Sequence, residues 1–199
     1  MLGALLAGSV LLFRLGCRWV DRDFNRSRRR ALSVAAEDGR AEALYMLAQD
    51  MMGSGSPSAA EAQRAVELYR RAADAGHGAA MDALAVCYMQ GNGVEQDSAR
   101  AIRLWQQSLA AGYHEARLAL AECYLEGMGV PQDEARAVAL YRQSAREDVP
   151  HAFYMLARCY LLGRGVPESR RSALKWLRRA ALYRHPEAEI LLDELEGDS

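Results

Sequence analysis

Alanine, leucine and tyrosine return together along this chain at a nearly constant spacing. Ala80, Ala116, Ala152 and Ala188 are each 36 residues apart, and Ala43 precedes Ala80 by 37. A leucine follows each alanine by four residues, and a tyrosine follows three of them by eight: Leu47, Leu84, Leu120, Leu156 and Leu192, then Tyr88, Tyr124 and Tyr160. Positions i, i+4 and i+8 lie along one side of a helix. The pattern therefore predicts that each unit begins with an amphipathic helix.

A glycine-rich stretch follows three of these predicted helices. The three stretches are Gly91-x-Gly93, Gly127-x-Gly129 and Gly163-x-Gly165. Glycine tolerates the positive φ that ends a helix and turns the chain. Residues suited to cap a second helix come next, at Asp97, Asp133 and Ser169. The first unit is irregular, and there Ser58 and Glu61 form a capping-box pattern instead.

The second predicted helix of each unit has apolar positions of its own. An alanine is followed by a bulky apolar pair in four units: Leu68-Tyr69, Leu104-Trp105, Leu140-Tyr141 and Trp176-Leu177. This helix ends near Gly76 and Gly112, and Asp148 and Arg184 occupy the matching later positions. A second-type helix alone precedes the array at roughly residues 26–38, and a first-type helix closes it at roughly 186–196. The sequence therefore predicts an all-α chain of helix–loop–helix–turn units.

These motifs resemble the Sel1-like repeat, a relative of the tetratricopeptide repeat. The shared order is A-x3-L-A/G-x2-Y, then G-x-G-V-x2-D, then R/K-A-x3-W/Y, and it covers residues 26–196. Three units match nearly throughout, and the first is degenerate. The resemblance implies a right-handed α-solenoid of stacked helix pairs with a period of 36 residues. It also implies a role as an adaptor or scaffold for protein complexes, often at membranes.

The N-terminal segment, residues 1–25, differs from the repeats. An uncharged apolar stretch is followed by Arg14, Arg18 and Arg22 at four-residue intervals. The stretch is shorter than the ~18 residues that span a bilayer, unless the first arginines extend to the headgroups. Positive charge after it favours repeats that remain in the cytoplasm. We therefore predict a membrane-anchor or targeting segment, with export to the periplasm or, in a eukaryote, a mitochondrial presequence as alternatives.

Composition indicates a folded domain that does not bind nucleic acid. The chain has 199 residues, 51% of them hydrophobic, and a net charge of −1. Basic residues are in excess within the first 30 residues, so the remainder is mildly acidic, ending in an acidic tail at residues 197–199. Proteins that bind nucleic acid need a basic face.

Recurring cysteines and histidines are the first candidates for chemistry. Equivalent helices of a solenoid lie ~8–10 Å apart, beyond the ~7 Å that a disulfide allows between Cα atoms. We therefore predict packed, reduced thiols at Cys87, Cys123 and Cys159. The histidines lie in the turns before first-type helices without a common register: His77, His114, His151 and His185. They are expected to be turn or cap residues and not metal ligands.

Two further patterns suggest catalysis only weakly. The Gly-x-Gly loops lack the preceding strand and the lysine of a nucleotide-binding loop. Ser172 and Lys175 match the S-x-x-K of penicillin-interacting enzymes, but the S-D-N and K-T-G partners of that motif are missing. We predict no catalytic residue, no cofactor and no metal.

Surface residues of the first-type helices remain as a candidate partner-binding site. Eight of them are neither Leu, Ala nor Tyr of the repeat: Met46, Gln49, Val86, Gln90, Glu122, Glu126, Arg158 and Leu162. Apolar residues near the ends and mixed charge between them would suit a helix or an extended peptide. We therefore predict a non-enzymatic, membrane-associated adaptor that binds a protein partner on its concave face. The alternative is a secreted or periplasmic protein with cell-wall or β-lactam-related ligand binding or enzymatic activity.

Overall fold

A computed structural model describes the protein over residues 29–37, 39–53 and 57–197. Over these ranges the chain forms helices and no strand, and residues 29–37 are helical. The helices that follow are α2 (Ala41–Met52), α3 (Ala59–Asp74), α4 (Gly78–Gln90), α5 (Ser98–Ala110), α6 (Ala116–Glu126), α7 (Glu134–Arg146), α8 (Pro150–Leu162), α9 (Arg170–Leu182) and α10 (Pro186–Gly197). The predicted all-α solenoid is confirmed. The segment of residues 1–25 lies outside the described residues.

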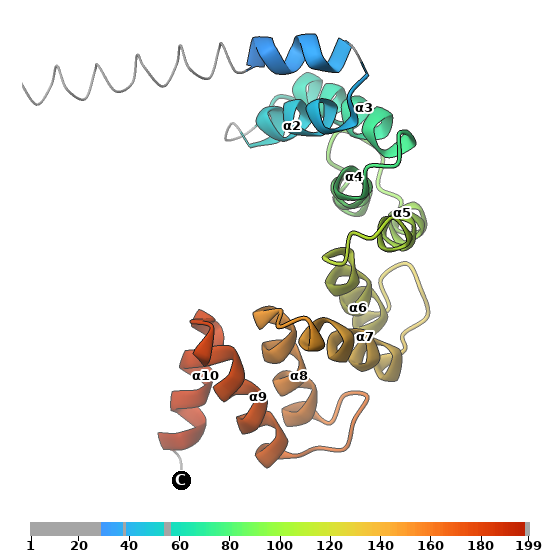
Figure 1. The fold of residues 1–199 in the computed structure, drawn as a ribbon. Helices are drawn as coiled ribbons and strands as arrows, with labels where there is room; N and C mark the ends of the chain where they lie inside the picture. The colour runs from blue at the N-terminus through green and yellow to red at the C-terminus, as the bar shows by residue number, and fades with distance from the viewer. Residues whose placement is uncertain (1–28, 38, 54–56, 198–199) are drawn as a thin grey trace, which may run out of the picture.

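Helices pack in pairs that repeat along an arc (Figure 1). The pairs are α2 with α3, α4 with α5, α6 with α7, and α8 with α9, and each pair also contacts the next. α10 packs on α9 at the C-terminal end. α2, α4, α6, α8 and α10 are the first-type helices, and α3, α5, α7 and α9 are the second-type helices. In the middle of the arc α4 lies on the inner side and α5 on the outer side (Figure 1).

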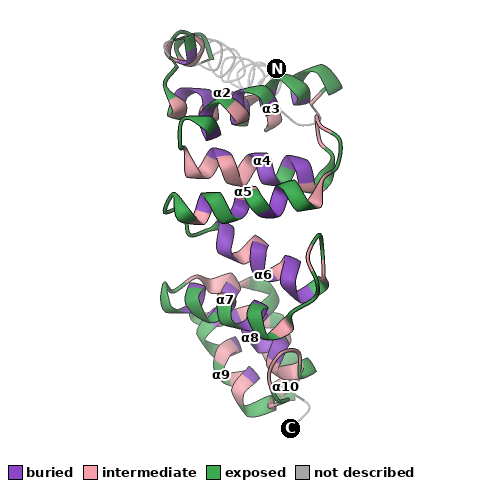
Figure 2. Cartoon of the chain, turned by 90° about the vertical axis from the view of Figure 1, so that its right-hand side faces the viewer, coloured by how far each residue is buried: buried purple, intermediate pink, exposed green. Residues whose placement is uncertain are grey.

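The core lies between the helices of each pair and between successive pairs. Figure 2 shows the buried residues on the sides of the helices that face other helices. One alanine position of four consecutive first-type helices has no exposed surface at all: Ala48, Ala85, Ala121 and Ala157. Because alanine is small, neighbouring helices can approach closely at this position. The buried residues form two clusters, one from Ala36 to Cys123 and one from Ala121 to Ala188, and the partly buried Val130 and Leu140 pack against both.

The predicted helix caps are present. The side chain of Asp97 accepts a hydrogen bond from the backbone N–H of Arg100 at 2.8 Å. Asp133 and Ser169 cap α7 and α9 in the same way. Ser58 and Glu61 form the capping box expected for α3. These caps satisfy backbone donors that have no partner inside the helix, so they fix where each second-type helix begins.

The turn after each second-type helix requires a left-handed residue. Its φ is +86° at Gly76 and +89° at Gly112, but +57° at Asp148 and +60° at Arg184. Residues with a Cβ atom are strained in this region by about 1 kcal/mol or more, whereas glycine is not. Asp148 and Arg184 therefore adopt, at the positions aligned with Gly76 and Gly112, a backbone conformation that favours glycine.

We expect Arg184→Gly to raise the free energy of unfolding by about 1 kcal/mol, because it relieves this backbone strain. The Arg184 side chain itself contributes little to stability, because its ion pair with Glu189 is long, at 3.4 Å, and the side chain is 88% exposed. Urea unfolding followed by circular dichroism measures the change. The reverse substitution, Gly112→Ala, should lower the same quantity by a similar amount. Equal stability of all three chains would contradict the strain argument.

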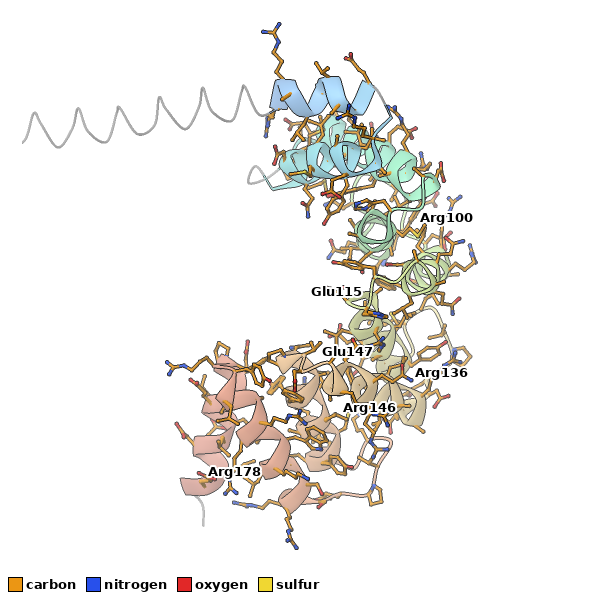
Figure 3. The ribbon with its side chains drawn as sticks, in the orientation of Figure 1. Arg100, Glu115, Arg136, Arg146, Glu147 and Arg178 are labelled. Carbon is orange, nitrogen blue, oxygen red and sulfur yellow. The ribbon has the colours of Figure 1, made fainter. Side chains whose placement is uncertain are left out.

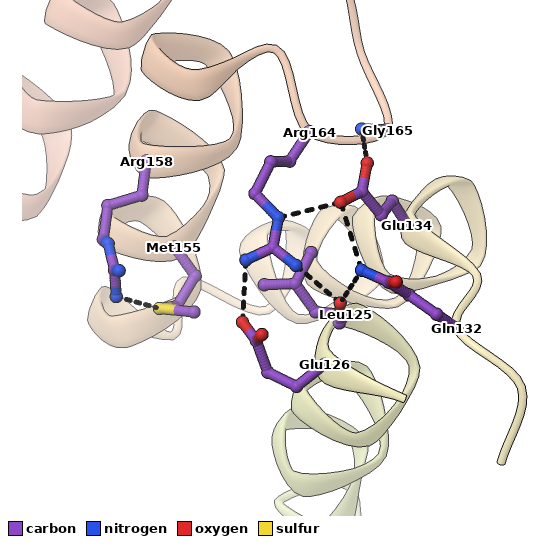
Figure 4. Close-up of polar contacts among 8 residues, drawn as sticks. All are labelled: Leu125, Glu126, Gln132, Glu134, Met155, Arg158, Arg164 and Gly165. Carbon is purple, nitrogen blue, oxygen red and sulfur yellow. Dashed lines mark hydrogen bonds and ion pairs between the residues drawn. The ribbon is translucent and has the colours of Figure 1, made fainter. Parts of the chain in front are cut away.

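Arg164, in the glycine-rich loop between α8 and α9, forms hydrogen bonds and ion pairs with the preceding unit, α6 and α7 (Figure 4). Its guanidinium donates to Glu134 Oε1 at 2.8 Å, to Glu126 Oε1 at 2.7 Å and to the carbonyl oxygen of Leu125 at 2.6 Å. Glu134 in turn accepts from the backbone N–H of Gly165 at 3.0 Å. One arginine therefore joins α6, α7 and the loop between α8 and α9.

Candidate partner-binding surface

The structure places all eight predicted surface residues on first-type helices. Six of them are exposed: Gln49, Val86, Gln90, Glu126, Arg158 and Leu162. Met46 and Glu122 are partly buried. The apolar members vary, because Val86 is 36% exposed and Leu162 is 61% exposed. The residues thus spread along α2, α4, α6 and α8 and do not gather into one pocket.

Some of these side chains are engaged within the chain. Glu126 is bound by Arg164 at 2.7 Å, and this bond lowers the pKa of the Glu126 carboxyl. Arg158 lies over the ring of Tyr154, with 4.0 Å between its guanidinium and the sulfur of Met155. Glu122 lies 3.6 Å from His151. Glu126 is therefore part of the internal contact between units, which makes it a weaker candidate for binding a partner than its sequence position indicated.

Charge is divided between the two kinds of helix. The first-type helices contain ten acidic residues and two basic ones, Arg117 and Arg158. Arg117 is 7% exposed and pairs with Glu147 at 2.8 Å. The second-type helices contain thirteen basic residues and four acidic ones. Figure 3 shows Glu115 on the inner side of the arc and Arg100 and Arg136 on its outer side. The first-type helices are therefore acidic as a group, with five of their ten acidic residues on α10 and none on α8, and the second-type helices are basic.

Partly exposed apolar and aromatic residues accompany the acidic groups. They occur two residues after the repeat alanine, at Tyr45, Leu118 and Tyr154, and Asp82 occupies the same position of α4. The carboxylate of Asp82 accepts a hydrogen bond from the indole N–H of Trp105 at 2.9 Å. We group six exposed or partly buried residues at these positions of α2, α4 and α6 under the name concave surface: Tyr45, Met46, Asp82, Val86, Leu118 and Glu122. Sequence analysis did not predict Tyr45, Asp82 or Leu118 as surface candidates, although all three stand two residues after a repeat alanine.

Burial and nearby carboxylates raise the pKa of two tyrosines next to these acidic groups. Burial and the neighbouring carboxylates of Asp82 and Glu115 raise the pKa of Tyr113 to about 12. Burial, then Asp82 and Glu42, raise the pKa of Tyr45. Both phenols are therefore neutral at physiological pH and can donate hydrogen bonds beside negative charge. Phenol faces with nearby carboxylates are groups that attract a cationic side chain.

Burial raises the pKa of Asp82, although the Trp105 hydrogen bond opposes the shift. A folded-state pKa above the unfolded value means that Asp82 contributes stability at low pH and loses it as pH rises through the folded pKa. We therefore expect the free energy of unfolding of Asp82→Asn, relative to that of wild type, to be higher at about pH 7 than at about pH 3. Urea unfolding of both chains at the two pH values measures the difference.

Glu61→Gln provides a control of opposite sign. Hydrogen bonds from the backbone N–H and the hydroxyl of Ser58 lower the pKa of Glu61. Its contribution is present above the unfolded pKa and is lost as pH falls. This variant should therefore lose stability relative to wild type as pH rises. The same pH dependence in both variants would contradict the assignment.

The cysteines are packed as predicted. Cys87, Cys123 and Cys159 are unpaired and at most 3% exposed. Burial raises the pKa of Cys87 and Cys123 to about 11. Because the thiolate is the nucleophile and the metal ligand, these thiols are inert at neutral pH.

Two structural roles are seen among the histidines. His77 caps α4, since its Nδ1 accepts from the backbone N–H of Ala80 at 3.1 Å. His151 and His185 have different offsets from the repeat alanine, and their ring nitrogens lie 3.2 Å from one another. The rings stack because α8 and α10 meet at that edge, which different offsets from the repeat alanine did not indicate. Within the described residues no group of three or more His, Cys, Asp or Glu side chains could hold a metal ion.

Ser172 and Lys175 of the S-x-x-K pair both line one open pocket on α9. The backbone N–H of Ser172 donates to the Ser169 hydroxyl that caps α9, and the two hydroxyls are 2.9 Å apart. Lys175 is exposed on the outside of the same helix. The serine thus belongs to a helix cap.

Comparison with known proteins agrees with this architecture. The family model described as Sel1 repeat matches residues 41–77, 78–113, 114–149 and 150–182. A Sel1 repeat protein from Oxalobacter formigenes is 28% identical, with a TM-score of 0.75 over 83% of this chain and 65% of that one. A protective antigen of uropathogenic Escherichia coli with an SLR fold is 28% identical, with a TM-score of 0.71 over 80% of this chain and 34% of the other. No curated protein matches the sequence.

A third structure shares the fold at low identity. Cysteine rich protein B of Helicobacter pylori is 16% identical and has a TM-score of 0.52 over 70% of this chain. The chain spans less than two thirds of the length of the first two structures. Four consecutive matches to the family model nevertheless cover most of the chain, in register with the four helix pairs of the arc. The chain belongs to the Sel1 repeat family.

Proposed function

We propose that the protein is a non-enzymatic adaptor whose concave surface binds a basic segment of a partner protein. Sel1 repeat proteins typically mediate protein–protein interactions and generally act as scaffolds without enzymatic activity. The observation that supports a basic partner here is the separation of charge between the inner and outer helices. A positively charged segment would be attracted to the inner side and repelled by the outer side.

The chemistry of the concave surface suggests how such a segment would be held. Val86 and Leu118 offer small apolar contacts between the acidic side chains. Tyr45 and Asp82 provide an aromatic face and a carboxylate suited to a lysine or arginine. A bound segment would therefore combine basic residues with one or two apolar anchors, and its association would weaken as salt screens the charges.

Capture from the native cell with two matched variants tests the proposal. Val86→Arg with Glu122→Arg makes the concave surface more positive and should abolish capture of a stoichiometric partner. Glu95→Arg with Gln106→Arg makes the same change in charge at exposed positions of the α4–α5 loop and α5. This control should leave capture intact. Loss of the partner in the control, or its retention in the concave variant, would overturn the proposal.

We also propose that residues 1–25 bring the adaptor to a membrane. None of the helices within the described ranges has the length and apolarity needed to cross a bilayer. The support for membrane contact is the apolar stretch and its arginines in the sequence. Deletion of residues 1–25 should move the protein from the membrane fraction to the supernatant. Unchanged membrane association of the shortened chain would show that the segment is not the anchor.

A further inference from the structure

Negative charge on α2, α4 and α6 is only partly balanced within the chain. These helices contain five acidic residues and one basic residue, Arg117, which is 7% exposed and pairs with Glu147. Asp82 of α4 and Glu122 of α6 belong to the concave surface. Glu115, just before α6, adds an exposed carboxylate on the inner side of the arc (Figure 3). Three carboxylates therefore follow one another along the inner side of α4 and α6.

Two tyrosines accompany these carboxylates. The charges of Asp82 and Glu115 both act on the phenol of Tyr113, and the charge of Asp82 also acts on the phenol of Tyr45. Tyr45 and Tyr113 likewise act on one another, so the four side chains are neighbours. An arginine can pair with a carboxylate and lie over an aromatic ring at the same time. This part of the inner side is therefore chemically suited to arginine.

A segment of the chain itself has the chemistry expected of the bound partner. Residues 14–28 contain five arginines and two aspartates, which gives a net charge of +3. Trp19 and Phe24 stand between the arginines and offer two apolar anchors. A partner segment for the concave surface was proposed above to combine basic residues with one or two such anchors. Residues 14–28 meet both requirements.

The segment joins the described structure close to the concave surface. The guanidinium of Arg29 donates to the carbonyl oxygen of Asp50 at 2.8 Å, near the C-terminal end of α2. Met46 of the concave surface precedes Asp50 by four residues, which is about 6 Å along a helix. The five residues 24–28 span about 16 Å when extended. They are therefore long enough to lead from the backbone of Arg29 to Met46.

The rest of the segment is long enough to cross the inner side. Packed helices lie ~8–10 Å apart, so the distance from α2 across α4 to α6 is about 16–20 Å. Residues 14–24 would cover about 15 Å as a helix and about 33 Å when extended. One arginine of the segment can therefore lie at Asp82 while another lies at Glu122.

We propose that residues 14–28 occupy the concave surface of their own chain whenever they are not bound to a membrane. The inference rests on the proposed function, because the segment takes the place of the partner's basic segment. Membrane contact and concave docking both use the arginines and Trp19, so the segment cannot do both at once. A tethered segment competes at an effective concentration in the millimolar range. The apparent affinity for a partner should therefore rise when the chain reaches a membrane.

Binding of a fluorescent synthetic peptide of residues 14–28 to the full chain, without lipid, tests this occupancy. The open variant, with Arg14→Gln, Arg18→Gln, Arg22→Gln and Arg26→Gln, should bind the peptide at least about 10-fold more tightly than wild type, whose surface is already filled. Adding Val86→Arg and Glu122→Arg to the open variant should abolish binding. A charge-matched control changes four exposed residues of the outer helices to glutamine and should keep the wild-type affinity: Arg64, Arg103, Arg146 and Arg171.

The outcomes separate this inference from the proposed function. Equal affinity of wild type and the open variant would overturn the inference alone, because the concave surface would still bind a basic segment. Peptide binding that survives Val86→Arg with Glu122→Arg, or no binding to the open variant, would also overturn it. Partner capture from the native cell remains the separate test of the proposed function.

Photo-crosslinking of the purified full chain tests whether the segment belongs to the same molecule. A photoreactive residue in place of Val86 should form an adduct with residues 14–28 that keeps the single-chain mass of 22.0 kDa, with a yield that does not change on dilution. Vesicles of phosphatidylglycerol and phosphatidylcholine should lower this yield by about tenfold. An adduct that joins two chains would refute occupancy within one chain. An unchanged yield with vesicles would refute release at the membrane.

Discussion

Gly165→Ala is expected to lower the free energy of unfolding by about 3 kcal/mol. A Cβ atom at this position would lie 2.3 Å from the carbonyl oxygen and 2.5 Å from the carbonyl carbon of Glu134. The backbone of the loop and that of α7 would have to separate, and the φ of +67° would add its own strain. The shift would also disturb the 3.0 Å hydrogen bond from the Gly165 N–H to the Glu134 carboxylate. Urea unfolding measures the loss.

Gly112→Ala separates the two contributions. Its φ is +89°, but no atom lies within 4 Å of the added Cβ atom, so only backbone strain of about 1 kcal/mol should remain. Because stability in a solenoid depends on contacts between neighbouring units, the Gly165→Ala defect should be local. Amide hydrogens of α8, α9 and α10 should exchange faster, and those of α2 to α5 should not. Equal effects of the two substitutions would refute the steric explanation.

Phe153→Ala should lower the free energy of unfolding by a similar amount, roughly 3–5 kcal/mol. Phe153 has no exposed surface and packs against Trp176, with 5.9 Å between ring centroids, and against Tyr183 at 5.8 Å. Arg179 covers the ring, with its guanidinium carbon 4.4 Å from the centroid. Truncation would leave a cavity between α8 and α9 that rigid neighbouring rings cannot fill. Urea unfolding again measures the effect.

Leu162→Ala is the matched control for a core truncation. Leu162 is on the same helix but is 61% exposed. Removing its side chain should change the free energy of unfolding by no more than about 0.5 kcal/mol. If this substitution were as costly as Phe153→Ala, the exposed end of α8 would have to be part of a packed interface.

The repeating framework could be predicted from the sequence because each of its features recurs. Alanine and leucine at a fixed spacing identified the first-type helices, and Asp97 and Asp133 identified the starts of the second-type helices. Asp148 and Arg184 could even be aligned with turn glycines, and they share the positive φ of those glycines. A residue pattern that predicts a helix or a turn only weakly in one unit becomes a strong prediction when it recurs in every unit.

Features that occur once could not be predicted in this way. Arg164 stands in a variable position of its loop, and its bond to Glu126 joins residues 38 positions apart. The contact of His151 with His185 depends on how closely α8 and α10 approach one another. The bond between Trp105 and Asp82 likewise needs the fold. Each requires the distance between two units, which spacing along the chain does not supply.

The division of charge was available in the sequence but needed the helices to be sorted first. Net charge of the repeat region is small, so composition alone conceals the difference between its two kinds of helix. Once residues are grouped by their place in the repeat, acidic residues gather on the inner helices and basic ones on the outer helices. A small net charge is therefore compatible with inner and outer helices of opposite net charge.

The central claim is that the concave surface binds the partner, and site-specific photo-crosslinking in the native cell tests it most directly. A photoreactive residue would replace Val86, at the exposed centre of the inner side, or Gln106, on the exposed side of α5. Concave binding predicts one dominant adduct from position 86, formed with a lysine- or arginine-rich segment, and none from position 106. An adduct from position 106 alone, or from neither position while the partner still co-purifies, would contradict it.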